Sequence, residues 1–147
     1  MIRPAKLFDV PALVELGREM HLESRFAGER YGADKVEGLL TRLISGDGVV
    51  FVAERDGEII GGFAGGTTDR WFNDTLVAFD YGLFVRRGER HGIIAMKLVS
   101  AFMRWAHALG VTTIECGVVS GVNTESTARM YEALGLKRVG VLLEAKV

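Results

Sequence analysis

A basic turn that contains two glycines is the part of this chain best suited to chemistry. It follows the apolar run Phe79–Val85, has the sequence Arg86-Arg87-Gly88-Glu89-Arg90-His91-Gly92, and leads directly into a long segment of helical apolar spacing from Ile93. A helix that begins there presents N–H groups without intrahelical partners and a partial positive charge. Glycine lets a ligand approach the backbone and arginine pairs with phosphate oxygens, so the turn predicts a phosphate or pyrophosphate site. A plain surface turn is the alternative.

The elements that must position this turn follow from apolar spacing and turn residues along the chain. The expected strands and helices follow one another in the order β-α-α-β-β-β-α-β-α-β. This order predicts an α/β (α+β) fold with a mixed sheet and helices on both faces. Asp56-Gly57 marks a hairpin, and the glycine pairs after it predict a bulged or curved strand. The expected strands are Ile2–Leu7, Val49–Arg55, Glu58–Thr68, Leu76–Val85 and Val111–Val118, with one last strand or a pair of short strands over Leu136–Val147. The expected helices are residues 9–20, Asp34–Ile44, Ile93–Leu109 and Thr124–Leu134.

Length and composition set outer limits on the function. The chain has 147 residues, 48% of them hydrophobic and 25% charged, so we expect residues 1–147 to form one domain without a need for disulfides or metals. A net charge of −1 gives no basic field for nucleic acid. No apolar run approaches a membrane span, a signal peptide is not expected, and Cys116 is the single cysteine, so we expect a cytoplasmic protein. The three histidines and Cys116 lack the spacing of metal ligands.

The element order and two motifs resemble the GNAT N-acetyltransferase superfamily, and the arginine spacing is similar to its phage-associated subgroup. In the best register, the cofactor motif of that family falls on Arg90-His91-Gly92-Ile93-Ile94-Ala95, where Ile93 stands at a position usually held by glycine. The second motif is Asn123 followed by a helix that contains Tyr131 and ends at Gly135-Leu136. The resemblance implies a GNAT-like, mostly antiparallel sheet and an acetyl-CoA-dependent transfer of acetyl groups to amines.

The same resemblance implies roles for individual residues. Asn123 would contact the pantetheine or nucleotide arm, and Tyr131 would lie near the thioester sulfur and act as general acid. Leu83 to Val85 would pair with the pantetheine like an added strand, and backbone N–H groups of an irregular strand segment there would donate to the thioester carbonyl. The pyrophosphate site would comprise Arg87, Arg90, His91, Gly92, Ile93, Ile94 and Ala95.

The proton of the amine needs a base, and Asp80 is the first candidate because it lies on the strand that leads to the turn. Glu115, on the neighbouring strand, is the second. A structural ion pair is the alternative for Asp80, a core tyrosine for Tyr131 and a plain helix cap for Asn123. Trp71 and Phe72 would line an acceptor pocket or an oligomer contact.

Two other functions compete with the transferase. One is a regulatory module that binds acyl-CoA without turnover, which the isoleucine at position 93 and the lack of an obvious base keep open. The other is a Rossmann-like nucleotide site, which the absence of Gly-x-Gly-x-x-Gly and the preceding strand meander disfavour. The acceptor amine, whether a small molecule or a peptide, is not readable from the sequence. Dimers are common among similar proteins, so a homodimer is also open.

Overall fold

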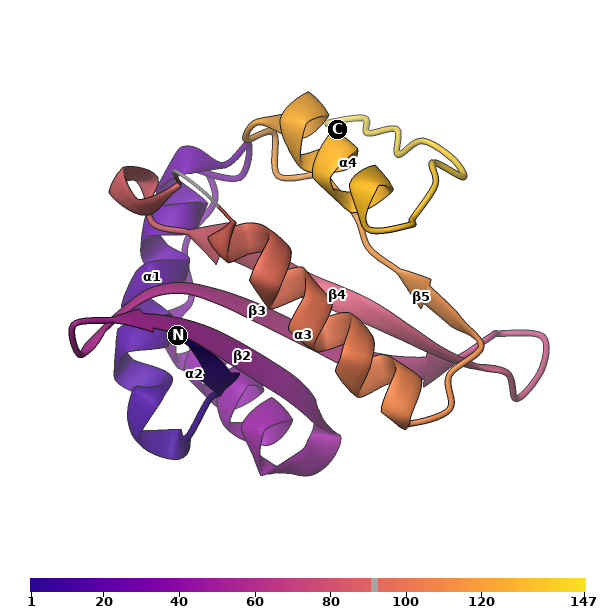
Figure 1. Ribbon diagram of the computed structural model, residues 1–147. Helices are drawn as coiled ribbons and strands as arrows, with labels where there is room; N and C mark the ends of the chain where they lie inside the picture. Colours follow the sequence, from indigo (N-terminus) through magenta and orange to yellow (C-terminus); the bar gives the residue numbers. More distant parts are fainter. Residues whose placement is uncertain (91–92) are drawn as a thin grey trace.

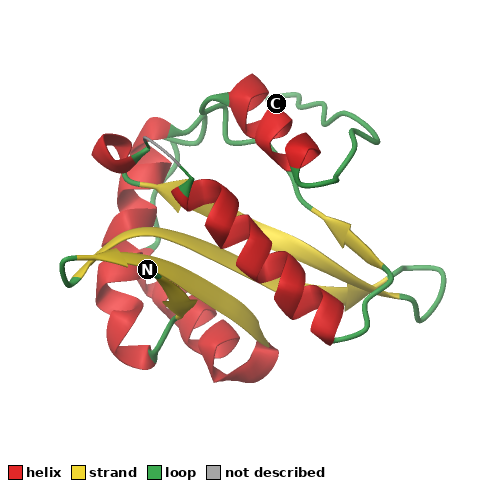
Figure 2. Ribbon diagram, in the orientation of Figure 1, coloured by secondary structure: helices red, strands yellow, loops and turns green. Residues whose placement is uncertain are grey.

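The computed structural model describes residues 1–90 and 93–147, and its centre is a five-stranded sheet in the order β1-β2-β3-β4-β5 (Figures 1 and 2). The first four strands pair antiparallel, and β5 pairs parallel to β4. The expected mixed, mostly antiparallel sheet is therefore confirmed. The strands are β1 (Ile2–Pro4), β2 (Gly48–Arg55), β3 (Glu58–Asp69), β4 (Leu76–Val85) and β5 (Thr113–Glu115), and the helices are α1 (Val10–Glu23), α2 (Ala33–Arg42), α3 (Ile94–Ala108) and α4 (Thr124–Ala133).

Helices cover both faces of the sheet, as Figure 1 shows with α3 in front and α1 and α2 behind. On the α3 face, Phe63 of β3 packs with Leu98 and Phe102 in one buried cluster. On the other face, Leu13 and Leu16 of α1 belong to a second cluster. Apolar residues three to four positions apart form one stripe along each helix. Because a helical conformation lets this whole stripe pack against the sheet, burial of the apolar side chains stabilises these segments as helices.

The long central hairpin is irregular where glycines permit it. Asp56 and Gly57 both have positive φ, 53° and 79°, as a tight hairpin turn requires. The register of β3 against β4 shifts between Ala64 and Gly65, which lie opposite Gly82 and Asp80. Tyr81 is thus the extra residue of a β-bulge, and bulges bend the strand that carries them. The register of β2 against β3 also shifts, between Ala53 and Glu54, which lie opposite Gly61 and Ile59. Ile60 is therefore an extra residue of β3 itself, and the bulged strand expected from the glycine pairs is confirmed.

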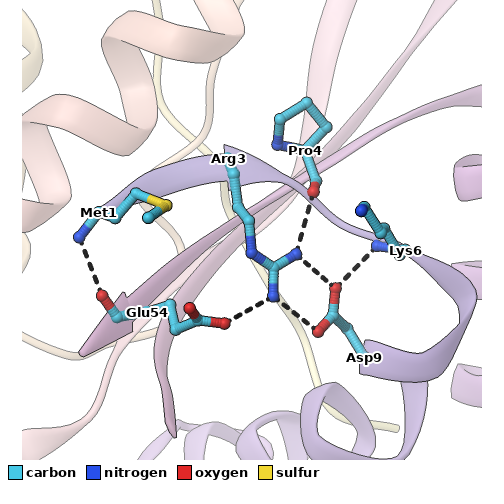
Figure 3. Close-up of polar contacts among 6 residues, drawn as sticks. All are labelled: Met1, Arg3, Pro4, Lys6, Asp9 and Glu54. Atoms are coloured by element: carbon cyan, nitrogen blue, oxygen red, sulfur yellow. Dashed lines mark hydrogen bonds and ion pairs between the residues drawn. The ribbon is translucent and has the colours of Figure 1, made fainter. Parts of the chain in front are cut away.

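A partly buried ion cluster connects the N-terminal strand to the start of α1 and to β2 (Figure 3). The Arg3 guanidinium donates to both carboxylate oxygens of Asp9, at 2.8 and 3.0 Å, and to Glu54 at 2.8 Å. The same Asp9 carboxylate accepts the backbone N–H of Lys6 at 2.7 Å. Asp9 does occupy the position before α1, but its side chain makes no capping bond to that helix, because the carboxylate faces back towards Arg3.

The last expected strand is wrong. Residues 136–147 contain no helix or strand, and Val139, Val141 and Leu143 are exposed. Their alternation is typical of a strand, but a strand also needs a neighbour, and none of these residues pairs with the sheet. The strand expected over Val111–Val118 is shortened to β5 for the same reason: only three of its residues pair with β4.

Candidate functional site

A cavity of about 830 Å³ opens where β4 and β5 diverge. The two strands pair only from Val77 to Phe79 and from Thr113 to Glu115, and then β4 continues alone to Val85. The edge of residues 80–85 that faces away from β3 therefore borders the cavity. Side chains of α1, α2 and the segment between them form one wall, and the start of α4 forms the other.

Along this cavity, β4 pairs regularly with β3 at Leu83–Val85 and irregularly at Tyr81. Leu83, Phe84 and Val85 all line the cavity and lie opposite residues 61–63 of β3 in unbroken register. The irregular segment is the bulge at Tyr81, two residues earlier. The irregular segment expected near Leu83 to Val85 thus lies slightly earlier in β4, where the extra residue Tyr81 is inserted opposite the step from Ala64 to Gly65.

The arginines that follow β4 are held by two glutamates of α1. Arg90 donates to both carboxylate oxygens of Glu23, at 3.0 and 2.7 Å, and its Nε donates to the carbonyl of Val85 at 2.6 Å. Arg87 reaches the same Glu23 at 3.3 Å, and Arg86 pairs with Glu19 at 3.1 Å. The Arg90 guanidinium holds the pKa of Glu23 below its usual range, so this carboxylate stays charged at neutral pH. Glu19 and Glu23 were missed in the sequence, where they lie 67 residues before their partners.

The start of α3 contributes the end of the cavity. Ile93 occupies the position before the helix, is 56% exposed and lines the cavity together with Ala95. Ile94 packs against the core cluster of the α3 face. The expected phosphate residues His91 and Gly92 lie outside the described residues. The backbone N–H groups of the first turn of a helix have no partners within the helix, and in α3 this turn lies at the end of the cavity lined by Ile93 and Ala95.

Asp80 lies half-buried in the cavity, just before the bulge, where β4 and β5 separate. Its Oδ1 accepts the backbone N–H of Gly117 at 3.0 Å, which bridges the two diverging segments. Burial raises the pKa of this carboxyl above its usual value, while the Gly117 hydrogen bond acts in the opposite direction. A carboxylate with a raised pKa is a stronger base than an exposed one, so the site retains a group that can accept a proton.

Tyr131 of α4 lies close to Asp80 and to Cys116, and both Tyr131 and Cys116 belong to the core cluster of the α3 face. Tyr131 is 4% exposed, yet it lines the cavity. Burial raises the pKa of Tyr131, and the nearby Cys116 and Asp80 raise it further. Burial also raises the pKa of the Cys116 thiol, to about 12. Both groups therefore remain protonated at neutral pH. Cys116 is a neighbour of Tyr131 that the sequence did not indicate.

Asn123 begins α4 in the left-handed conformation, with φ 47°, and its side chain makes no capping bond. It lines the cavity. The segment before it is held by Arg25, whose backbone N–H donates to Ser120 at 2.8 Å and whose guanidinium bonds Val119 and Glu144. This residue, also missed in the sequence, ties the loop after α1 to the chain beyond β5.

Other sequence candidates lie away from the cavity. Glu115 pairs with Arg70 at 3.0 Å and is absent from the lining, which leaves Asp80 as the carboxylate of the site among the described lining residues. Trp71 and Phe72 are 94% and 62% exposed at the turn between β3 and β4, and neither lines the cavity. Within the described residues, no three histidine, cysteine or acidic side chains gather as a metal site, and no helix combines the length and apolarity of a membrane span.

Comparison with known proteins identifies the fold. The aminoglycoside acetyltransferase AAC(6')-Iy, solved with the bisubstrate analogue CoA-S-monomethyl-acetylneamine, superposes with a TM-score of 0.80 at 20% identity, covering 100% of this chain and 97% of that one. A predicted acetyltransferase from Clostridium acetobutylicum, solved with acetyl-CoA, gives 0.81 at 15% identity over 99% and 95% of the two chains. Ribosomal-protein-alanine N-acetyltransferase from Brucella melitensis biovar Abortus gives 0.74 at 14% identity over 100% and 99%.

At these identities the solved structures support a common fold and no more. No curated protein sequence matches the chain. The model of the acetyltransferase (GNAT) family, however, matches residues 15–136, which include most of both walls of the cavity, the strand β4, the basic turn and α4. The diverging strands β4 and β5 and the cavity between them are consistent with this match. This chain therefore belongs to the acetyltransferase (GNAT) family.

Proposed function

We propose that this protein is an acetyl-CoA-dependent N-acetyltransferase that transfers an acetyl group to a primary amine of a small molecule or peptide by direct attack in a ternary complex. One observation carries the proposal: a single cavity joins the free edge of β4, the start of α3, and the pair Asp80 and Tyr131. Residues 1–147 would act as one acetyltransferase-like domain. Homodimer formation and a cytoplasmic location stay predictions.

Acetyl-CoA would occupy the part of this cavity that is formed by β4, the start of α3 and α4. The edge of β4 at Leu83–Val85 extends beyond its pairing with β5, so a pantetheine arm could add there like a strand, although the Val85 carbonyl already accepts a bond from Arg90. A diphosphate would lie at the start of α3, near Ile93, Ile94 and Ala95, and within reach of Arg87 and Arg90. Asn123 would contact the arm from α4. His91 and Gly92 belong to the same proposed set.

Acetyl-CoA would supply the acetyl group as a thioester, and the side chains of this protein would move the protons. Asp80 would take the proton that the amine loses, directly or through one water, because its buried carboxyl has a raised pKa. Tyr131 would donate its hydroxyl proton to the departing sulfur. Since burial keeps the phenol protonated, it is a hydrogen-bond donor at every pH near neutrality.

Known structures support the donor and the acceptor class without deciding the acceptor. The Clostridium protein was solved with acetyl-CoA, and AAC(6')-Iy with an analogue that joins CoA to an aminoglycoside fragment. Both share the fold of this chain. The acceptor would enter on the side of α1 and α2.

The test is thiol release from acetyl-CoA over a panel of primary amines, with CoA binding measured separately by calorimetry. We expect Tyr131→Phe to lower kcat by roughly 10²-fold or more while CoA affinity stays within about twofold. Trp71→Ala is the control, because it removes an exposed aromatic side chain outside the cavity and should change neither value.

The results separate the alternatives. Wild-type turnover by Tyr131→Phe would refute the general-acid assignment. CoA binding without transfer to any amine would favour the regulatory acyl-CoA module, for which the pairing of Arg90 with Glu23 is the structural argument. Absence of CoA binding would reject both functions.

A further inference from the structure

The wall of the cavity formed by α1, α2 and the segment between them is almost entirely apolar. It contains the side chains of Leu13, Leu16, Met20, Phe26, Tyr31 and Leu39. We call this surface the N-terminal wall. Met20 approaches β4 closely, since a Cβ placed on Gly82 would lie 3.6 Å from its methyl carbon. The Tyr31 hydroxyl is already used, because it donates to the carbonyl of Val14 at 2.7 Å.

Acidic residues occur on α1, but they do not face the cavity. Glu15 pairs with Arg18, Glu19 with Arg86, and Glu23 with Arg87 and Arg90. Every one of these carboxylates has a cationic partner, and none lines the cavity. The negative charges that the sequence places on this helix are therefore unavailable to a bound ligand.

Across the described part of the chain, Asp80 is the only acidic side chain in the lining of the cavity. The basic side chains in the same lining are His21 and Arg90. A single carboxylate can compensate a single ammonium group. A second ammonium in the same cavity would lack a counter-charge and would meet an apolar wall, and burying an unpaired charge is strongly unfavourable.

We propose that the acceptor is a monoamine with an apolar body, and that polyamines and aminoglycosides are poor acceptors. This inference rests on the proposed function for its reaction, but it concerns binding and can be tested without turnover. The amine would lie near Asp80, and its hydrocarbon part would contact the N-terminal wall. Each added methylene should tighten binding roughly fourfold until the wall is filled.

The sharpest test compares hexylamine with 1,6-diaminohexane, which have the same length and differ by one terminal ammonium group. Binding of each to the protein, with and without CoA, is measured by calorimetry, and kcat/KM is measured where acetyl transfer occurs. We expect hexylamine to bind at least roughly tenfold tighter, and propylamine to bind more weakly than hexylamine. Spermidine and kanamycin extend the comparison to several ammonium groups.

A charge placed on the wall should reverse the preference. Met20→Glu adds a carboxylate opposite Gly82, so the advantage of hexylamine over the diamine should shrink or invert. Leu22→Glu is the matched control, because it adds the same charge to an exposed position of α1 outside the lining and should leave the wild-type ratio unchanged. Circular dichroism checks that both variants are folded, and the wild-type amine series decides the question if one is not.

Each outcome bears on one proposal. Equal or tighter binding of 1,6-diaminohexane by the wild type overturns the inference, whether or not acetyl groups are transferred. Preferred binding of hexylamine without acetyl transfer to any amine supports the binding preference and favours the regulatory acyl-CoA module over the transferase. Efficient transfer to spermidine or kanamycin, with poor transfer to hexylamine, supports the function and rejects the monoamine acceptor.

Discussion

Replacing Gly65 with alanine should destabilise the protein, because the position has no room for a methyl group. An ideal Cβ at Gly65 lies 2.4 Å from Cε1 of Phe102 and 2.8 Å from the carbonyl oxygen of Phe79. Carbon atoms pack at roughly 3.5–4.0 Å, so the ring would have to move by about 1 Å. Phe102 is fully buried, and its ring lies 4.5 Å from that of Phe63.

The expected cost follows from two opposing effects. Overpacking of a filled core costs about 1–3 kcal/mol, and the upper end applies because one of the clashing atoms is backbone. Alanine recovers roughly 0.5–1 kcal/mol through its lower entropy in the unfolded chain. The free energy of unfolding of Gly65→Ala should therefore fall by about 2 kcal/mol.

The neighbouring glycine is the control. A Cβ at Gly66 would lie 3.6 Å from the Phe79 ring and 3.7 Å from that of Tyr81, which is ordinary contact. Gly66→Ala should be neutral or stabilising by up to about 1 kcal/mol. Urea unfolding followed by circular dichroism measures both variants, and Phe102→Leu in the Gly65→Ala background should recover part of the loss. Equal stabilities of the two alanine variants would refute the steric argument.

Two further predictions concern ion pairs. Asp9→Asn should lower the free energy of unfolding by about 2 kcal/mol at pH 7, since it removes charge-assisted bonds to Arg3. Those bonds hold the pKa of Asp9 below its usual value. The difference in the free energy of unfolding between the wild type and Asp9→Asn should therefore be complete above the unfolded pKa, near 3.8, and disappear as the pH falls through the lower pKa of the folded state. A difference that stays constant from pH 7 to about pH 2 would contradict this. Glu23→Gln removes a negative charge beside Arg90 and the proposed diphosphate site, so CoA should bind roughly fivefold tighter at low salt, with a smaller gain at high salt. Calorimetry at two salt concentrations measures it, and unchanged or weaker binding would show that Glu23 matters for orienting Arg90 instead.

Local patterns predicted the elements that depend on local interactions. The strand Leu76–Val85 has the predicted bounds, and the helix that begins at Thr124 ends within one residue of its expected limit. The Asp56-Gly57 turn was predicted because these residue types tolerate the positive φ that a tight hairpin requires, and both residues have positive φ in the structure. The residue types at these places leave few alternatives, whatever the remainder of the chain does.

Features that depend on distant partners were beyond local patterns. Glu23 has the same type and helical setting as a solvated surface residue, and its pairing with Arg90 appears only when α1 packs beside the end of β4. The tail after Leu136 alternates like a strand, but a pattern cannot show whether a sheet edge accepts it. Asp80 and Tyr131 were selected as candidates from the sequence, and the structure adds Cys116 and the Gly117 bond as their neighbours.

The two walls of the cavity come from separate parts of the chain. Residues 13–40 supply the wall that would select the acceptor, whereas the strand edge, the basic turn and α4 belong to residues 80–131. Selectivity can therefore diverge among descendants of such a protein through substitutions in its first quarter, while the donor half stays under separate constraint. Arg25 links the two parts, because it belongs to the first quarter of the chain and donates hydrogen bonds to the carbonyls of Val119 and Ser120. Chimeras that exchange the first two helices would have to keep this arginine.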